Sequence, residues 1–261
     1  MAYREDDDLK FLGEMESEVL SDLVDVLTKD KDGSARLTEE LTSSELYKQH
    51  APDHNKYWEL IAAEIQLFGG NTIVSNVFRL GKGVLYREVL QDVCDKLKVQ
   101  YAKHESVESI EAQLLAKLFA DMMDKMSADE REEFAKVVGL EAVKTFAPEA
   151  MAAAVQAAII AGGFASYRIA LIVANQVSRA LLGRGLTLAA NATLARTIGV
   201  ISGPIGWAVT GAWTLVDIAS PAFRVTLPAV VHVALLRKMH RAKVEGLIKE
   251  LEKELAGGAA A

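Results

Sequence analysis

The stretch that decides the fold is residues 150–167, AMAAAVQAAIIAGGFASY, 18 consecutive positions without a charge. A second uncharged run of 20 residues, 197–216, reads TIGVISGPIGWAVTGAWTLV. Both runs lie within residues 149–236, which contain two acidic residues, five arginines and no lysine. Their alanine, glycine and aliphatic residues predict an Ala/Gly-rich apolar helical hairpin in the C-terminal half of the chain.

Charge is divided unevenly along the 261 residues. Residues 1–147 hold 18 Lys and Arg against 30 Asp and Glu, a net charge of −12, whereas residues 148–236 carry +3 and residues 237–261 carry +2. This division predicts an acidic helical domain (1–147), an apolar helical region (148–236), and a charged amphipathic C-terminal helix and tail (237–261). The acidic half offers no basic stripe that would neutralise phosphates, so we expect no nucleic-acid partner.

The apolar residues recur at spacings of three and four, and alternating β-branched residues are few, so we expect an all-α, multi-helix bundle. Apolar stripes predict helices near residues 17–27, 57–68, 85–97 and 107–126. Ser127 and Glu130 have the spacing of a capping box, which predicts a helix from this point toward Phe146.

The apolar runs have only marginal membrane-insertion energy. Eighteen helical residues reach about 27 Å, slightly less than a hydrocarbon core of about 30 Å. The strongest inserting residues of the first run contribute about −2 kcal/mol together, which its glutamine, serine and glycines offset. These residues are Val155, Ile159, Ile160 and Phe164. Two interpretations stay open: a hairpin buried inside a soluble bundle, and an amphitropic hairpin that is shielded in water and lies on or inserts into a bilayer.

Candidate contact residues follow from the second interpretation. Gly199 and Gly203 have the small-xxx-small spacing that lets helices approach closely. Tryptophans and arginines are typical of a membrane interface, and the prolines divide the apolar region into segments. The candidate membrane or partner contacts are Gly199, Gly203, Pro204, Gly206, Trp207, Trp213, Arg224 and Pro228.

Motifs of catalysis and metal binding are incomplete. Residues 28–39 match part of a calcium loop but begin with threonine, so we interpret them as a helix-helix turn. Cys94 is expected to be a packed thiol, and His50 and His54, separated by a proline, to be solvated loop residues. Residues 81–83, GKG, fail the phosphate-loop pattern and predict a turn. We therefore expect no enzyme, no cofactor and no metal site.

A resemblance to a known family begins at residues 61–97, IAAEIQLFGGNTIVSNVFRLGKGVLYREVLQDVCDKL. Further matching pieces lie at residues 8–12, 33–38, 203–206 and 222–228. The chain resembles the YaaW-like family of bacterial proteins, which is grouped with the ubiquinol-cytochrome c chaperones. Its family motif includes Phe68, Gly69, Gly70, Asn71, Gly81, Gly83, Tyr86 and Arg87. Within this motif, we interpret Gly69 and Gly70 as a helix stop and Asn71 as the cap of the next helix.

The resemblance implies a helical fold without a catalytic motif, and its chaperone grouping implies a role in assembling a membrane respiratory complex. Our first hypothesis is a non-enzymatic, membrane-associating protein whose apolar hairpin gives an amphitropic or pore-forming state. The alternative is a soluble chaperone or assembly factor. The expected partners are membrane lipid or a membrane-protein client, together with a homo-oligomer. Because the N-terminus is acidic where a signal peptide would be basic, we expect a cytoplasmic protein. Its apolar half predicts peripheral or inserted association with the inner membrane.

Overall fold

A computed structural model describes residues 3–36, 41–72, 83–140, 143–187 and 223–258. Every regular element in these ranges is a helix. Lys29 and Ala35 form an isolated antiparallel β-bridge. The prediction of an all-α, multi-helix bundle is confirmed.

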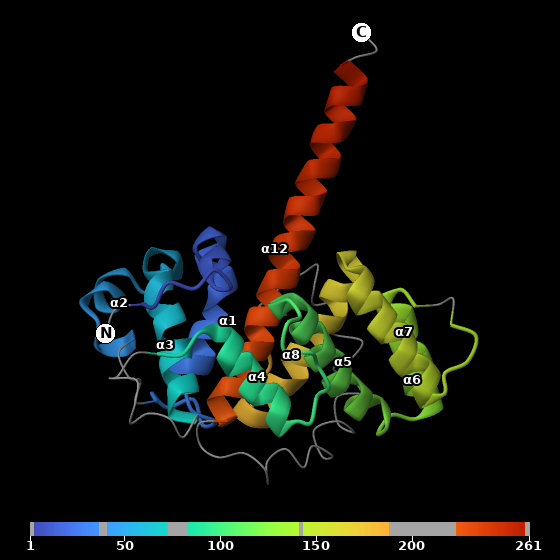
Figure 1. Ribbon diagram of the computed structural model, residues 1–261, viewed down its shortest axis with the longest axis horizontal. Helices are drawn as coiled ribbons and strands as arrows, with labels where there is room; N and C mark the ends of the chain where they lie inside the picture. The colour runs from blue at the N-terminus through green and yellow to red at the C-terminus, as the bar shows by residue number, and fades with distance from the viewer. Residues whose placement is uncertain (1–2, 37–40, 73–82, 141–142, 188–222, 259–261) are drawn as a thin grey trace.

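The elements are named in chain order (Figure 1). The 3-10 helices are η1 (Lys10–Glu14), η2 (Leu41–Ser43) and η3 (His54–Tyr57). The α-helices are α1 (Ser17–Thr28), α2 (Glu45–His50), α3 (Trp58–Thr72), α4 (Tyr86–Lys96), α5 (Val107–Met123), α6 (Ala128–Val138), α7 (Pro148–Ala161), α8 (Gly163–Leu182) and α12 (Phe223–Gly258).

Helix α12 is the central element of the bundle. Figure 1 shows α1 to α3 on one side of it and α5 to α8 on the other, with the C-terminal part of α12 projecting beyond the remaining helices. Its side chains from residue 225 to 236 are buried, whereas Arg241 and several residues after it are exposed. The first part of α12 therefore belongs to the core, and its packing holds together segments that are far apart in the sequence.

The apolar region and the acidic region contribute to the same core. Leu20 of α1, Leu90 of α4 and Leu118 of α5 belong to one hydrophobic cluster with Ile172 of α8 and Val230 of α12. Burying such side chains removes apolar surface from water at about 25 cal/mol per Å², which is the main favourable term in folding. Helix α8, which begins inside the first uncharged run and continues beyond it to Leu182, is therefore mostly core.

One predicted interruption of the C-terminal part is wrong. Pro228 was expected to divide the apolar region, but α12 is continuous from Phe223 to Gly258 with Pro228 inside it, and the helical part of residues 237–261 continues this same helix. Pro228 is the sixth residue of the helix, so its missing N–H removes one hydrogen bond close to the helix start. Burial of the apolar side chains around it offsets that loss.

Two predicted helix ends also differ from the structure. Helix α3 continues through Gly69, Gly70 and Asn71 to Thr72, so neither the predicted stop nor the Asn71 cap occurs. Glycine accepts helical dihedral angles at a cost of about 1 kcal/mol, and a pair of glycines is not by itself a stop. The predicted capping box at the start of α6 is confirmed, but this helix ends at Val138, with Gly139 (φ 80°) as its C-cap, before the expected Phe146.

The first uncharged run is divided by a sharp turn. Gly162 and Gly163 have φ angles of 77° and 66°, a region that side chains with a Cβ rarely adopt. The chain bends by 118° between α7 and α8 at this point. Ile160 and Phe164, the residues on either side of the turn, are consequently held at the surface.

Candidate functional site

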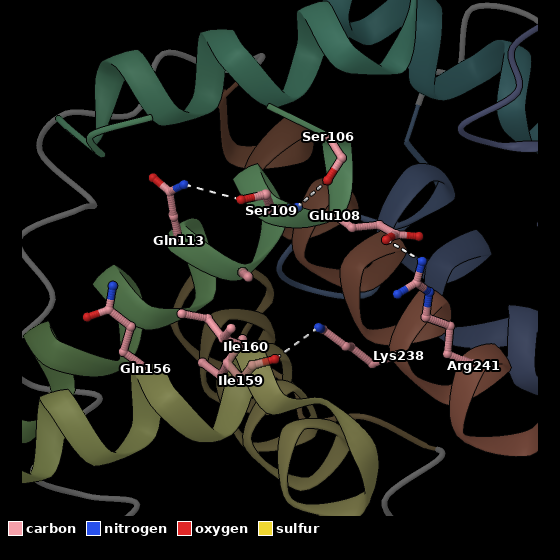
Figure 2. A pocket seen from close by; sticks show the side chains of 10 residues that line it. Ser106, Glu108, Ser109, Gln113, Gln156, Ile159, Ile160, Lys238 and Arg241 are labelled. Carbon is pink, nitrogen blue, oxygen red and sulfur yellow. Dashed lines mark hydrogen bonds and ion pairs between the residues drawn. The ribbon is translucent and has the colours of Figure 1, made fainter. Parts of the chain in front are cut away.

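A groove lies between α5, α7 and the middle of α12 (Figure 2). It has a volume of about 290 Å³, at the lower end of the range for pockets that bind small molecules or single side chains. It is lined by Ser106, Glu108, Ser109, Ala112, Gln113, Gln156, Ile159, Ile160, Lys238 and Arg241. We refer to these residues as the α5–α7–α12 groove.

The apolar side of the groove is formed by the end of α7. Ile159 is buried, whereas the next residue, Ile160, is 72% exposed. Beyond the glycine turn, Phe164 is 58% exposed, and its ring lies 4.2 Å from the guanidinium carbon of Arg168. Large apolar side chains exposed next to a pocket are typical of protein-binding surfaces. We call Ile160 and Phe164 the apolar corner.

The polar side of the groove is formed by α12 and the start of α5. Figure 2 shows Lys238 and Arg241 reaching from α12 toward the groove, opposite the amide side chains of Gln113 and Gln156. Arg241 forms an ion pair with Glu108, the second residue of α5. The groove therefore combines an apolar wall with charged and amide groups, a composition suited to binding rather than to a defined chemical reaction.

A buried polar network lies behind the groove. Arg237 Nε donates to Glu111 Oε2 at 2.9 Å, and Tyr86 Oη donates to Glu111 Oε1 at 2.8 Å. Burial raises the pKa of Glu111, although the Arg237 charge opposes this shift. Burial also raises the pKa of Tyr86, and the Glu111 charge adds to the shift. Because each polar group here has a partner, the network has the character of a structural connection between α4, α5 and α12.

Most of the predicted contact residues lie outside the described part of the chain. These are Gly199, Gly203, Pro204, Gly206, Trp207 and Trp213. Of the other two, Arg224 is exposed near the start of α12, and Pro228 is buried within it. Neither residue lines the α5–α7–α12 groove. Their roles in membrane or partner contact stay predictions.

The family-motif residues occupy several places. Phe68 packs against the core from α3. Gly83 approaches α3 so closely that an added Cβ would lie 2.6 Å from Gln66 Cβ. Tyr86 begins α4 and joins the buried network, while Arg87 Nη1 donates to the Glu105 carbonyl at 2.7 Å. The other members are the helical Gly69, Gly70 and Asn71, and Gly81, which is outside the described residues.

The predicted cysteine environment is confirmed, and one histidine environment is not. Cys94 is completely buried, and burial raises the pKa of its thiol to about 12, so at neutral pH it is a packed, unreactive group. His54, expected to be solvated, is buried against Tyr57, because η3 folds it onto the core. Within the described residues, no three His, Cys, Asp or Glu side chains are placed to hold a metal ion.

Membrane-spanning potential is limited to one pair of helices in the described ranges. Helices α7 and α8 have the length and composition of a span when taken together, but the 118° bend separates them. Taken singly, neither of these two nor another helix of the described part is long and apolar enough. The exposed residues of the apolar corner are carried by this pair.

In the sequence, the apolar corner is part of a continuous uncharged run, and no local pattern marks Lys238 or Arg241 as site residues. The adjacent glycines at 162 and 163 were the available signal for a turn that exposes Ile160 and Phe164. The charged side of the groove depends on contacts between α5 and α12, and no local pattern encodes them.

Comparison with known proteins gives consistent matches. The family model described as ubiquinol-cytochrome C chaperone matches residues 53–232, and one described as a domain of unknown function matches residues 3–37. A UPF0174 protein of Helicobacter pylori strain J99 is 46% identical over 237 residues, covering 91% of this chain and 93% of that protein. The UPF0174 protein YaaW of Escherichia coli strain K12 is 32% identical over 243 residues, covering 91% and 96%. No solved structure matches.

Proposed function

Because the chain belongs to the YaaW-like family, which is grouped with the ubiquinol-cytochrome C chaperones, we propose that it is a chaperone or assembly factor for a subunit of a membrane complex. The observation that carries this proposal is the match of the chaperone family model to residues 53–232, which include the α5 and α7 walls of the groove. The same assignment supports a non-enzymatic role, and we propose that the protein acts at the cytoplasmic face of the inner membrane.

The apolar corner supports a client-binding role. Ile160 and Phe164 are large and exposed, and they lie beside a groove that offers hydrogen-bonding amides. Toward the C-terminal end of α7, the exposed residues Ala153, Gln156 and Ala157 carry no charge, whereas the exposed Glu149 lies in the first turn of this helix. An uncharged helix face next to exposed apolar side chains suits an apolar helical segment of a client, because association removes apolar area from water on both partners.

The membrane-inserting hypothesis has less support. Helix α8 contributes buried side chains to the core, including Ile169, Ile172 and Val177, so insertion would require this packing to be lost. Removing a buried aliphatic side chain from such a core typically costs about 2–5 kcal/mol. Direct binding of membrane lipid and formation of a homo-oligomer stay predictions.

The test is quantitative affinity capture from membranes solubilised in mild detergent, using the full chain as bait. We expect wild type to enrich a defined membrane-protein subunit, and a variant with Ile160→Ser and Phe164→Ser to recover at least fivefold less. Leu46→Ser is the matched control, because Leu46 is also exposed (47%) but lies on α2, away from the groove. Equal recovery by the corner variant, or failure of wild type to enrich any membrane-protein subunit, would contradict the proposal.

A further inference from the structure

Three basic side chains lie close together on α12, and one of them lacks a carboxylate partner. Arg237 pairs with Glu111, and Arg241 pairs with Glu108. Lys238, between them in the sequence, donates from Nζ to the main-chain carbonyl of Ile159 at 3.3 Å. Across the described ranges, no Asp or Glu oxygen forms an ion pair with Lys238. This ammonium group therefore points into the groove with its charge only partly compensated.

The surroundings of Lys238 favour the arrival of an anion. Burial lowers the pKa of Lys238, because desolvation disfavours the ammonium form; Glu111 and Glu108 oppose that shift, and Arg241 and Arg237 add to it. Among the residues that line the groove, the charges of Lys238, Arg241 and Glu108 sum to +1. The Glu105 carboxylate is not part of this lining, and it accepts from Ser109 Oγ and Gln113 Nε2 on the α5 wall. The N-terminus of the 17-residue helix α5 lies at the same place and adds a partial positive charge.

The other walls of the groove determine which chemical groups fit next to a bound anion. Ile159 and Ile160 form an apolar surface next to the Lys238 ammonium, and Figure 2 shows them between Lys238 and the two glutamines. Gln156 carries an amide of the kind that hydrogen-bonds to main-chain atoms of a peptide, whereas Gln113 Nε2 already donates to Glu105 Oε2 and Ser109 Oγ, which leaves Gln113 Oε1 as an acceptor. A volume of about 290 Å³ admits a carboxylate and one adjacent side chain, but not a large cofactor.

We propose that the α5–α7–α12 groove binds a carboxylate of the client polypeptide, with the carboxylate on the Lys238 ammonium and the adjoining apolar side chain against Ile159 and Ile160. This inference rests on the proposed client-binding function and adds the chemistry that the client must present. Charge-assisted hydrogen bonds of this kind are about twice as strong as neutral ones, so the carboxylate contributes specificity as well as affinity.

The probe is a fluorescein-labelled peptide with the C-terminal sequence Ala-Ala-Ile-Leu, prepared with a free carboxylate and with a C-terminal amide. A third peptide, amidated but with glutamate replacing the final leucine, separates a side-chain carboxylate from a chain terminus. Fluorescence anisotropy with the full chain should show about tenfold tighter binding of either carboxylate peptide than of the amidated Ala-Ala-Ile-Leu peptide, and Lys238→Gln should remove this ratio.

The controls keep structural effects separate. Lys238→Arg retains the charge and should retain the preference, which a merely destabilised groove would not. Lys243→Gln is the matched surface control, because Lys243 lies on the same helix but pairs with Glu16 outside the groove.

Equal affinity of the three peptides, or failure of all three to bind wild type, would overturn the inference. Capture of a client that depends on Ile160 and Phe164 would then still support the proposed function, so the two failures are distinguishable. Tighter binding of laurate than of the carboxylate peptides would also overturn it.

Discussion

Arg237 and Glu111, 126 positions apart in the sequence, form an ion pair with side chains that are only 10% and 1% exposed. The same Arg237 guanidinium donates from Nη2 to the main-chain carbonyl of Asp8 at 2.6 Å and lies 4.5 Å from the ring centre of Phe11. Tyr86 Oη donates a hydrogen bond to the other oxygen of the Glu111 carboxylate. This pair therefore connects the N-terminal segment, α4, α5 and α12 at the point where the core part of α12 ends.

Removing one partner of this pair should destabilise the fold more than removing both. Arg237→Met leaves the Glu111 carboxylate buried without its counter-charge, and we expect a loss of about 3–5 kcal/mol in the free energy of unfolding. The double variant with Glu111→Leu should recover much of that loss, because apolar groups replace both charges. Urea unfolding followed by circular dichroism measures both values. A double variant that is less stable than Arg237→Met would contradict this account.

Replacing either of two neighbouring amide side chains of α8 by leucine should change the stability of the protein in opposite directions. Gln176 is buried, and neither its side-chain oxygen nor its nitrogen has a hydrogen-bond partner within the described residues. Asn175, also buried, accepts from the Leu186 N–H at 3.0 Å. We expect Gln176→Leu to stabilise the protein by about 1–2 kcal/mol and Asn175→Leu to destabilise it by about 1–3 kcal/mol.

Thermal unfolding of the two variants at equal protein concentration checks the difference in sign. A Gln176→Leu variant that melts below wild type would show that the Gln176 amide makes a contact needed for stability.

Stability should fall on mild acidification because of buried histidines. Burial lowers the pKa of His232, while its contact with the Pro228 carbonyl and the charge of Asp22 oppose the shift. Below about pH 6.5 the unfolded chain therefore binds a proton that the folded chain resists, so stability declines from that pH toward the lower folded pKa. Burial also lowers the pKa of His54, which contributes in the same direction.

The measurement is the free energy of unfolding between pH 7.5 and pH 5.5. We expect His232→Leu to reduce the loss of unfolding free energy as the pH falls. His104→Leu, at an exposed loop position, should leave this loss as in wild type. An unchanged slope in the His232 variant would exclude His232 as a source of the pH dependence.

Gly83 should be intolerant of a side chain. A Cβ at this position would lie 2.6 Å from Gln66 Cβ and 3.1 Å from the Gln66 carbonyl carbon, so α3 would have to move. Gly83→Ala is expected to cost about 1–3 kcal/mol. Gly246→Ala is the matched control, because no atom lies within 4 Å of its added Cβ on α12, and it should stabilise by up to about 1 kcal/mol. Equal melting temperatures for the two variants would contradict the close approach.

The helical class and several boundaries could be predicted because they depend on local interactions. The Ser127–Glu130 capping box uses side chains three positions apart, and it starts α6 as expected. Two glycine pairs of the chain have different structures. Gly69 and Gly70 continue α3, whereas Gly162 and Gly163 make the turn between α7 and α8. The same dipeptide has opposite outcomes, so the surrounding packing decides between them.

The candidate site could not be predicted for a related reason. Lys238 lies 79 positions from the Ile159 carbonyl that it contacts, and helical periodicity carries no information about which helices become neighbours. Composition identified the apolar run but not which of its residues would stay exposed. Exposure of Ile160 and Phe164 follows from the turn at Gly162 and from burial of the opposite faces of α7 and α8.

The central claim is that the apolar corner contacts a client protein. Its most direct test places a photo-crosslinking amino acid at Ile160 of the full chain in living cells and identifies the adducts by mass spectrometry, with the same amino acid at Leu46 as the control. The account predicts an adduct between position 160 and a membrane-protein subunit that is absent from position 46. Adducts to lipid alone, or the same protein adducts from both positions, would contradict it.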